Sequence, residues 1–563
     1  MTDLPPDAIA TDGFDADWIV VGSGFGGSVA ALRLARKGYS VLVVECGRRF
    51  EDADFARSTW NLRRYFWAPR LGLRGIMRLS LFRDVFIATG AGVGGGSLGY
   101  ANTLYRAHDD TFYRAAQWDG MADWRAELAP HYDTAERMLG VTQYGPAGPA
   151  DELIRRLGSE LGVEDTFALT RVGVFLGEPG VEVEDPYFDG EGPARSGCIR
   201  CGRCMIGCRY NAKNTLVKNY LWLAERAGAR ITPDREVTTI QPLNAHGEVD
   251  VDADGSHGWQ LGTVRPGAWL RRRPEQLRAR RGVVVAAGAL GSTKLLLRQR
   301  LRGTLPRLSD RVGHLVRTNS ESILAVTAPD DSRDFTASVA ISSSIYPDPY
   351  THIEPVTYGS GGGAVGMLST LMVGDGTRVT RPLRFLGQAI RHPIRLAKVT
   401  WPQRWSSRSF LVLVMQSHDN AIRLRGRRRL LGSGIKVTTE QDAGRPNPTY
   451  LPIANQAAAR ISEYIGGIPQ SSVTEALFNV PTTAHLLGGC AMGRSVEEGV
   501  VDERHEAFGY RGLLVVDGSA MPANVGVNPS LTITALAERA MAFVPDAAPP
   551  VDSAAGDESL TPA

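Results

Sequence analysis

The sequence has little cysteine, little net charge and no long apolar run. Six cysteines in 563 residues are too few for a disulfide framework, and a formal net charge of +3 gives no general case for a nucleic-acid partner. No apolar run approaches the roughly 18 residues of a membrane span. Residues 1–17 lack the basic and apolar regions of a secretory signal. These absences favour a cytoplasmic protein without a transmembrane segment.

A glycine-rich turn near the start of the chain dominates what is present. Within residues 18–45, an apolar strand is followed by the G-x-G-x-x-G turn of Gly22, Gly24 and Gly27, then by a small-residue helix and a second apolar strand. The first glycine permits the tight turn, the second lets the backbone approach a pyrophosphate, and the third lets the helix pack closely. Glu45 ends the second strand, where a carboxylate binds ribose hydroxyls. The pattern predicts a dinucleotide site without separating NAD from FAD.

Further along, residues 88–107 contain five glycines between Gly90 and Gly96. Such a run suits backbone that lies against a flat or anionic ligand, because the missing side chains permit close approach. The alternative is a flexible loop, which the flanking strand-like residues disfavour. We therefore expect this run to contact the same ligand as the first turn.

Two segments combine aromatic and basic residues and contain no acid, residues 58–83 and 378–408. We expect the first to form a loop or short helices over a ligand entrance. The second carries eight Lys or Arg residues within a long region, 318–475, that predicts an antiparallel sheet. A solvated helix face and a peripheral membrane-surface patch are equally compatible with it.

Four of the six cysteines follow the spacing C-x₂-C-x₂-C-x₃-C. Short loops wrap iron–sulfur clusters with this spacing, whereas zinc sites pair two C-x₂-C units across a longer loop. Four reduced structural thiols are the alternative. The candidate iron–sulfur ligands are Cys198, Cys201, Cys204 and Cys208.

Four separated segments together resemble one family. The chain is similar to the glucose–methanol–choline (GMC) flavin oxidoreductases, from residue 19 to residue 540, and within them to the cholesterol oxidases of actinobacteria. The matching segments read VVGSGFGGSVAALRL, GAGVGGGSLGYANTLY, VVVAAGALGSTKLLL, and AHLLGGCAMG with VVDGSAMPANVGVNPSLTITALAERA.

The resemblance implies an α/β fold, α+β overall, in which a Rossmann-like FAD-binding domain is interleaved with an antiparallel-sheet substrate domain. We expect disordered tails at both ends of the chain. The expected divisions are a tail over 1–16, FAD-binding parts over 17–110, 191–315 (with the cysteines) and 479–544 (with the catalytic pair), a cap over 111–190, a substrate-binding sheet over 316–478, and a tail over 545–563.

The resemblance also implies FAD as the cofactor, and His485 and Asn528 as the catalytic pair. Family members usually place a flavin-contacting asparagine three or four residues after Ser97, where this chain has Tyr100 and Ala101; we choose Asn102 instead. The expected FAD-binding residues are Gly22, Gly24, Phe25, Gly26, Gly27, Glu45, Gly90, Gly95, Gly96, Ser97, Asn102, Val237, Ala287, Asp517, Gly518, Asn528 and Pro529.

The implied activity is oxidation of a secondary alcohol on a bulky apolar substrate, such as the 3β-hydroxyl of cholesterol, by hydride transfer to the flavin. The alternatives are an iron–sulfur-containing alcohol dehydrogenase that passes electrons to a protein or quinone, and a non-catalytic electron-transfer flavoprotein. Some members also isomerise their product with an active-site glutamate. The chain has no clean match to that residue, and Glu321 and Glu354 are the nearest candidates in sequence.

Overall fold

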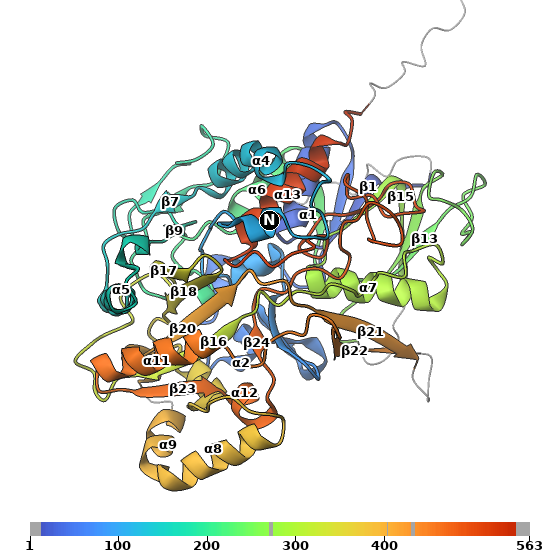
Figure 1. Ribbon diagram of the computed structural model, residues 1–563. Coiled ribbons are helices and arrows are strands. Elements are labelled where there is room, and N and C mark those ends of the chain that lie inside the picture. The colour runs from blue at the N-terminus through green and yellow to red at the C-terminus, as the bar shows by residue number, and fades with distance from the viewer. Residues whose placement is uncertain (1–12, 269–273, 402–403, 429–433, 548–563) are drawn as a thin grey trace, which may run out of the picture.

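The computed structural model describes residues 13–268, 274–401, 404–428 and 434–547, and two seven-stranded sheets organise them (Figure 1). In the first sheet, β1, β2, β12, β25 and the end of β15 run parallel, while β14 is antiparallel to both of its neighbours. Its order is β12 (Arg230–Thr232), β2 (Val41–Val44), β1 (Ala16–Val21), β15 (Glu275–Val285), β14 (Trp259–Val264) and β13 (Glu236–Pro242), with β25 (Leu513–Val515) also paired to β15.

Helices cover this first sheet and explain its apolar strands. Ile19, Val20 and Val283 are fully buried, as expected where a parallel sheet is covered on both faces. α1 (Phe25–Arg36) packs against α6 (Tyr220–Arg226) and α13 (Ser530–Ala542), and α13 packs against α4 (Trp124–Leu139). α7 (Ala289–Arg302) packs on β13 and on the hairpin of β21 (Ile422–Arg428) and β22 (Ile435–Gln441).

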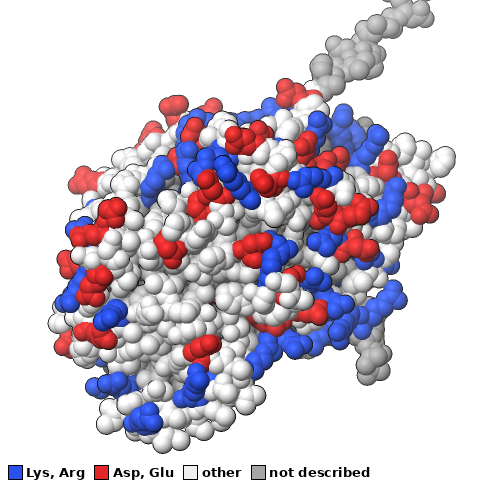
Figure 2. Space-filling model, viewed as in Figure 1, with Lys and Arg blue, Asp and Glu red and all other residues white. Residues whose placement is uncertain are grey.

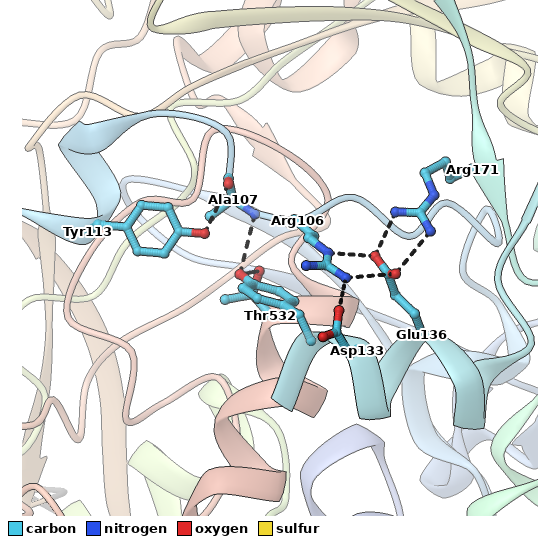
Figure 3. Close-up of polar contacts among 8 residues, drawn as sticks. Arg106, Ala107, Tyr113, Asp133, Glu136, Arg171 and Thr532 are labelled. Atoms are coloured by element: carbon cyan, nitrogen blue, oxygen red, sulfur yellow. Dashed lines mark hydrogen bonds and ion pairs between the residues drawn. The ribbon is translucent and has the colours of Figure 1, made fainter. Parts of the chain in front are cut away.

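A polar network fastens α4 to its surroundings (Figure 3). Glu136 of α4 accepts hydrogen bonds from Arg106 and Arg171, with oxygen–nitrogen distances of 2.6–3.0 Å, and Arg106 also pairs with Asp133. Burial raises the pKa of Glu136, but the hydrogen bonds from the two arginines outweigh it and hold that pKa below its usual value. The segment that follows the second glycine run is thereby held against α4.

The second sheet is antiparallel and has two different faces. Along β20, Phe410, Val412 and Val414 pack beneath two helices, while Leu411 and Leu413 point to the opposite face. The two helices are α5 (Pro149–Glu160) and α11 (Pro452–Tyr464). The strand order is β19 (Ser369–Leu371), β23 (Ile468–Ser472), β16 (Ser322–Thr327), β20 (Ser409–Gln416), β18 (Thr351–Val356), β17 (Ser343–Asp348) and β8 (Ala168–Leu169).

These two sheets confirm the predicted fold class, and several local predictions need correction. The segment 58–83, expected as loop or short helices, does contain two short helices, residues 62–65 and 69–71, but it also contains strands, because residues 77–81 pair with residues 86–90. Within the segment 378–408, which lies in the region expected as sheet, residues 380–391, 393–400 and 405–408 are helical, and the second glycine run ends in a 3-10 turn, residues 95–98. The remaining α-helices and strands, with two of the 3-10 helices (η), are α2 (Leu62–Tyr65), β3 (Trp67–Ala68), β4 (Leu73–Arg74), β5 (Met77–Leu81), β6 (Phe86–Gly90), η3 (Gly95–Leu98), α3 (Asp110–Tyr113), β7 (Thr142–Gln143), β9 (Arg171–Val172), β10 (Glu182–Val183), β11 (Arg195–Ser196), η7 (Gly363–Leu368), α8 (Thr380–Arg391), α9 (Pro393–Thr400), α10 (Trp405–Arg408), α12 (Val473–Phe478) and β24 (Thr482–Thr483).

Most of the two predicted tails, residues 1–12 and 548–563, lies outside the described residues. At the C-terminal end, Ala547 N still donates to Lys37 O at 2.8 Å, so ordered structure extends a little past residue 545. No helix within the described ranges is long and apolar enough to span a bilayer.

Candidate active site

One cavity of about 1560 Å³ joins the two sheets. Its lining includes the turn after β1, the second glycine run, the ends of β13, β15 and β25, and the free face of the antiparallel sheet. Ligand sites are usually about 300–1,000 Å³. The larger volume here suits a dinucleotide and a substrate together.

The first glycine turn is shaped by close backbone contacts. Gly22 has φ +100°. A Cβ added at Gly26 would lie 1.6 Å from Val516 O, and one added at Gly27 would lie 2.1 Å from Gly22 O. Gly24 differs, because its Cβ would meet no described atom nearer than Gly95 Cα at 4.0 Å. Gly24 lines the cavity and is the N-cap of α1, whose first N–H groups favour an anion.

The second glycine run lies directly against the first. A Cβ on Gly95, which has φ +53°, would lie 2.6 Å from Gly24 Cα, and one on Gly90 would lie 2.6 Å from Gly96 Cα. Glu45 joins both turns, since its carboxylate accepts from Ser23 Oγ at 2.8 Å and from Gly92 N at 3.4 Å. Two bare backbone turns beside a helix N-terminus form a cradle that fits the pyrophosphate of FAD.

Most residues expected to bind FAD line this cavity, and three do not. Gly27 lies beneath the turn, and Ser97 is buried with its Oγ bonded to Gly94 O and Leu216 N. Asn102 is fully buried with φ 59°, and its amide atoms have no hydrogen-bond partner among the described residues. The expected residues that do line the cavity are Gly22, Gly24, Phe25, Gly26, Glu45, Gly90, Gly95, Gly96, Val237, Ala287, Asp517, Gly518, Asn528 and Pro529, together with His485.

His485 follows β24 and lies beside a buried carboxylate. Its Nδ1 is 3.1 Å from Glu321 Oε2, which also accepts from Thr483 Oγ1 at 2.7 Å and Ala484 N at 3.0 Å. An acceptor at this position holds a proton on Nδ1 and leaves the lone pair of Nε2 available. His485 is therefore arranged to accept a proton at Nε2.

Asn528 precedes α13 and lies between His485 and a second carboxyl group. Its Nδ2 is 3.5 Å from His485 Nε2 in one amide orientation. In the opposite orientation, Nδ2 donates to both oxygens of Glu354, at 2.9 and 3.2 Å. Burial raises the pKa of Glu354 well above its usual value, and the nearby charge of Glu321 adds to this effect. The four side chains form a continuous polar group.

The carboxyl groups that contact His485 and Asn528 were the part of the site that the sequence predicted least well. From the sequence, Glu321 and Glu354 are only the nearest candidates for an isomerising glutamate, and neither is predicted to contact His485 or Asn528. The sheet register explains their convergence: Ser322 pairs with Val414 and Glu354 pairs with Leu413, so Glu321, immediately before β16, and Glu354, within β18, lie on the two sides of β20. The available signal was an acid inside the otherwise apolar strand segment of residues 353–356.

Apolar side chains form the part of the cavity wall beside the antiparallel sheet. They come from the free face of the antiparallel sheet and from the segments that cover it. Those from the sheet region are Ile323, Ile341, Val356, Leu411 and Leu413, and those opposite are Tyr65, Phe66, Met77, Met205, Tyr358 and Val365.

The four clustered cysteines lie beside the cavity, near Met205. No three His, Cys, Asp or Glu side chains in the described ranges are placed to hold a metal ion together. Burial raises the pKa of Cys198 to about 11 and also raises that of Cys204, so the thiol forms are favoured over thiolates. Lys213 ties this loop to the second glycine run by donating to Cys204 O, Leu98 O and Tyr100 O. An iron–sulfur cluster here stays a prediction.

Comparisons with known proteins show the family to which this chain belongs. Residues 17–343 match the FAD dependent oxidoreductase model, and residues 437–537 match the GMC oxidoreductase C-terminal model. The cholesterol oxidase of Mycobacterium tuberculosis (strain ATCC 25618 / H37Rv) is 48% identical over 543 residues, which cover 94% of this chain and 91% of that protein. The cholesterol oxidase of Acinetobacter baumannii is 44% identical, covering 94% of this chain and 95% of that protein.

The fold has a counterpart among solved structures. The crystal structure of pyridoxine 4-oxidase from Mesorbium loti aligns with a TM-score of 0.59 at 15% identity, covering 93% of this chain and 98% of that chain. A sequence identity this low supports a shared fold and nothing more. The family follows from the matched models and from relatives at 44–48% identity: the chain belongs to the GMC oxidoreductases and is an FAD-dependent enzyme that oxidises CH–OH groups.

Proposed function

We propose that the protein oxidises the 3β-hydroxyl of a sterol such as cholesterol. The observation that carries this proposal is the shared cavity, in which the His485–Asn528 pair and the dinucleotide cradle adjoin an apolar wall. A flat, rigid hydrocarbon substrate would bury its ring system against such a wall. The names of the relatives at 44–48% identity support the same substrate class.

The proposed cofactor contacts follow from the cradle. The backbone of Gly22–Gly26 and Gly95–Gly96 would receive the pyrophosphate, and Glu45 would receive ribose hydroxyls. Asp517 lines the cavity with its Oδ1 accepting from Ser519 N at 2.8 Å, which fixes the turn after β25. Bound FAD supplies the hydride acceptor, which no side chain can replace.

The chain's own residues handle the hydroxyl proton. As hydride leaves the carbinol carbon, the hydroxyl proton must pass to an acceptor within hydrogen-bond reach. His485 Nε2 is that acceptor, and Glu321 stabilises the resulting imidazolium through Nδ1. With Nδ2 donating to Glu354, Asn528 turns its Oδ1 toward His485, where it can accept a hydrogen bond from the substrate hydroxyl before the proton passes to Nε2.

Anaerobic flavin reduction tests this proposal directly. We expect cholesterol to bleach the flavin absorbance of the holoenzyme, while its 3α-epimer and cyclohexanol bleach it far more slowly. Leu413→Trp narrows the apolar wall and should raise the KM for cholesterol at least about tenfold with a smaller change in kcat. Val249→Trp, at an exposed position outside the cavity, is the matched control. Equal reduction by all three alcohols would contradict a sterol site.

Glu354 leads to a prediction about pH and stability. Because its folded-state pKa is raised, the folded protein retains this proton over a range in which the unfolded chain has lost it. Stability is therefore lost as pH rises from the ordinary glutamate range, about 4.3, toward the folded pKa, at about 1.4 kcal/mol per pH unit. Glu354→Gln removes this loss.

The measurement is the thermal unfolding temperature of wild type and Glu354→Gln across this pH range. The variant should be the more stable protein at neutral pH, and the difference should vanish in acid. Glu248→Gln, at an exposed glutamate, is the control. A wild-type advantage at neutral pH would show that Glu354 is ionised in the folded protein.

A further inference from the structure

Helix α8 presents its apolar side chains to solvent. Leu383, Leu386 and Ile390 follow helical spacing on one face, and Leu383 and Ile390 are 61% and 73% exposed. Ile394 of α9 is also 73% exposed, and Trp401 follows at 64%. Amphipathic surface helices of globular proteins normally turn such a stripe inward.

A buried arginine fixes α8 in this orientation. Arg381 is fully buried, and its guanidinium lies 3.4 Å from Glu475 Oε2 and donates to Asn479 Oδ1 at 2.9 Å. Leu383 lies two residues further on, about 200° around the helix axis. An ion pair buried under one side of α8 therefore holds the opposite, apolar side outward, and rotating the helix would break that pair.

Positive charge borders the stripe. Arg391, Arg395 and Lys398 are exposed, and residues 376–408 contain no Asp or Glu. Figure 2 shows uncharged and basic side chains over the lower end of the molecule, where Figure 1 places α8 and α9. A partner for this surface must offer both apolar contact and negative charge.

The same surface adjoins the cavity mouth. α9 packs against η7, in which Met367 and Leu368 line the cavity and are 59% and 42% exposed. Trp60, from the first aromatic-basic segment, and Trp401 line a second hollow of about 820 Å³. The two segments without acid therefore meet beside the entrance.

We infer that the α8–α9 surface docks on an anionic lipid bilayer. The stripe of Leu383, Leu386, Ile390 and Ile394 would enter the boundary between headgroups and acyl chains, while Arg391, Arg395 and Lys398 contact anionic headgroups. This arrangement places the cavity mouth at the membrane surface, where an apolar alcohol resides. Docking does not require the proposed sterol substrate. The substrate only explains why the cavity mouth would lie at a membrane.

Flotation of the full-length holoenzyme with sterol-free vesicles tests the inference. We expect binding to vesicles of equal parts phosphatidylcholine and phosphatidylserine, weakened by salt, and much weaker binding to phosphatidylcholine alone. Replacing Leu383, Leu386 and Ile390 by serine should lower the partition coefficient more than about tenfold. Reversing three charges together, with Arg391→Glu, Arg395→Glu and Lys398→Glu, should lower the partition coefficient by about fivefold or more for each charge.

Leu161→Ser with Val249→Ser and Val251→Ser, at exposed apolar positions on other elements, is the matched control and should bind as wild type does. Oxidation of sterol held in cyclodextrin should be unchanged in the α8 variants, whereas oxidation from vesicles should fall. Wild-type vesicle binding by both sets of variants would overturn the inference. So would a dimer in light scattering that the serine variants convert to monomers, because a second copy would then cover the stripe.

Discussion

His485→Gln is expected to slow anaerobic reduction of the flavin by alcohol about 10²–10⁴-fold while FAD remains bound. Glutamine retains a polar side chain of similar reach but has no basic nitrogen, so the hydroxyl proton loses its acceptor. The imidazole is 3.1 Å from Glu321 and 3.5 Å from Asn528, which leaves Nε2 as the basic atom in the cavity. Stopped-flow absorbance of the flavin measures the rate.

Two further variants separate loss of the proton acceptor from general effects of a substitution. His246→Gln, at an exposed histidine outside the cavity, should reduce at the wild-type rate. Glu321→Gln removes the charge that stabilises the imidazolium; we expect a smaller loss of rate and an altered pH profile. Reduction at the wild-type rate in His485→Gln would remove this histidine from the mechanism.

Gly24→Asp is expected to abolish FAD retention while leaving the protein folded. At this position the protein leaves room for a side chain, since a Cβ would lie no nearer than 4.0 Å to Gly95 Cα. The aspartate would occupy the space into which the pyrophosphate must come and would repel its charge. The flavin-to-protein absorbance ratio after purification, with circular dichroism of the same sample, measures both effects.

The neighbouring Gly26 supplies the contrast. A Cβ there would lie 1.6 Å from Val516 O, so Gly26→Ala should disturb folding itself. Gly374→Asp, with no described atom within 4 Å of the added Cβ and outside the cavity, should be neutral. Stoichiometric FAD in Gly24→Asp would show that the first turn does not hold the pyrophosphate.

The sequence predicted this cavity better than it predicted the polar contacts inside it. The turn of Gly22–Gly27 is visible because its requirements are local: a tight bend, a small-residue helix and an acid at a set distance. Glu321 and Glu354 are 33 positions apart, and only their shared neighbour β20 brings them to His485 and Asn528. No periodicity within either strand reports that register.

The orientation of α8 was unpredictable for a related reason. Helical spacing of Leu383, Leu386 and Ile390 shows an apolar stripe, but a stripe alone does not say whether it faces the core or the solvent. The deciding contact is between Arg381 and Glu475, which lie far apart in the chain. Pairs of this kind become visible only when the fold is known.

Strand β15 has a consequence for how the chain is made. Its final residues pair with β1, near the N-terminus, and with β25, where Val283 pairs with Leu513. Ribosomes synthesise proteins from the N-terminus, so β15 emerges long before β25 and its edge stays open meanwhile. The nascent chain must therefore avoid aggregation through that edge, and the dinucleotide cradle, whose Gly26 packs on Val516, should mature only once β25 has been synthesised. Slow folding and a requirement for chaperones during overexpression are the expected signs.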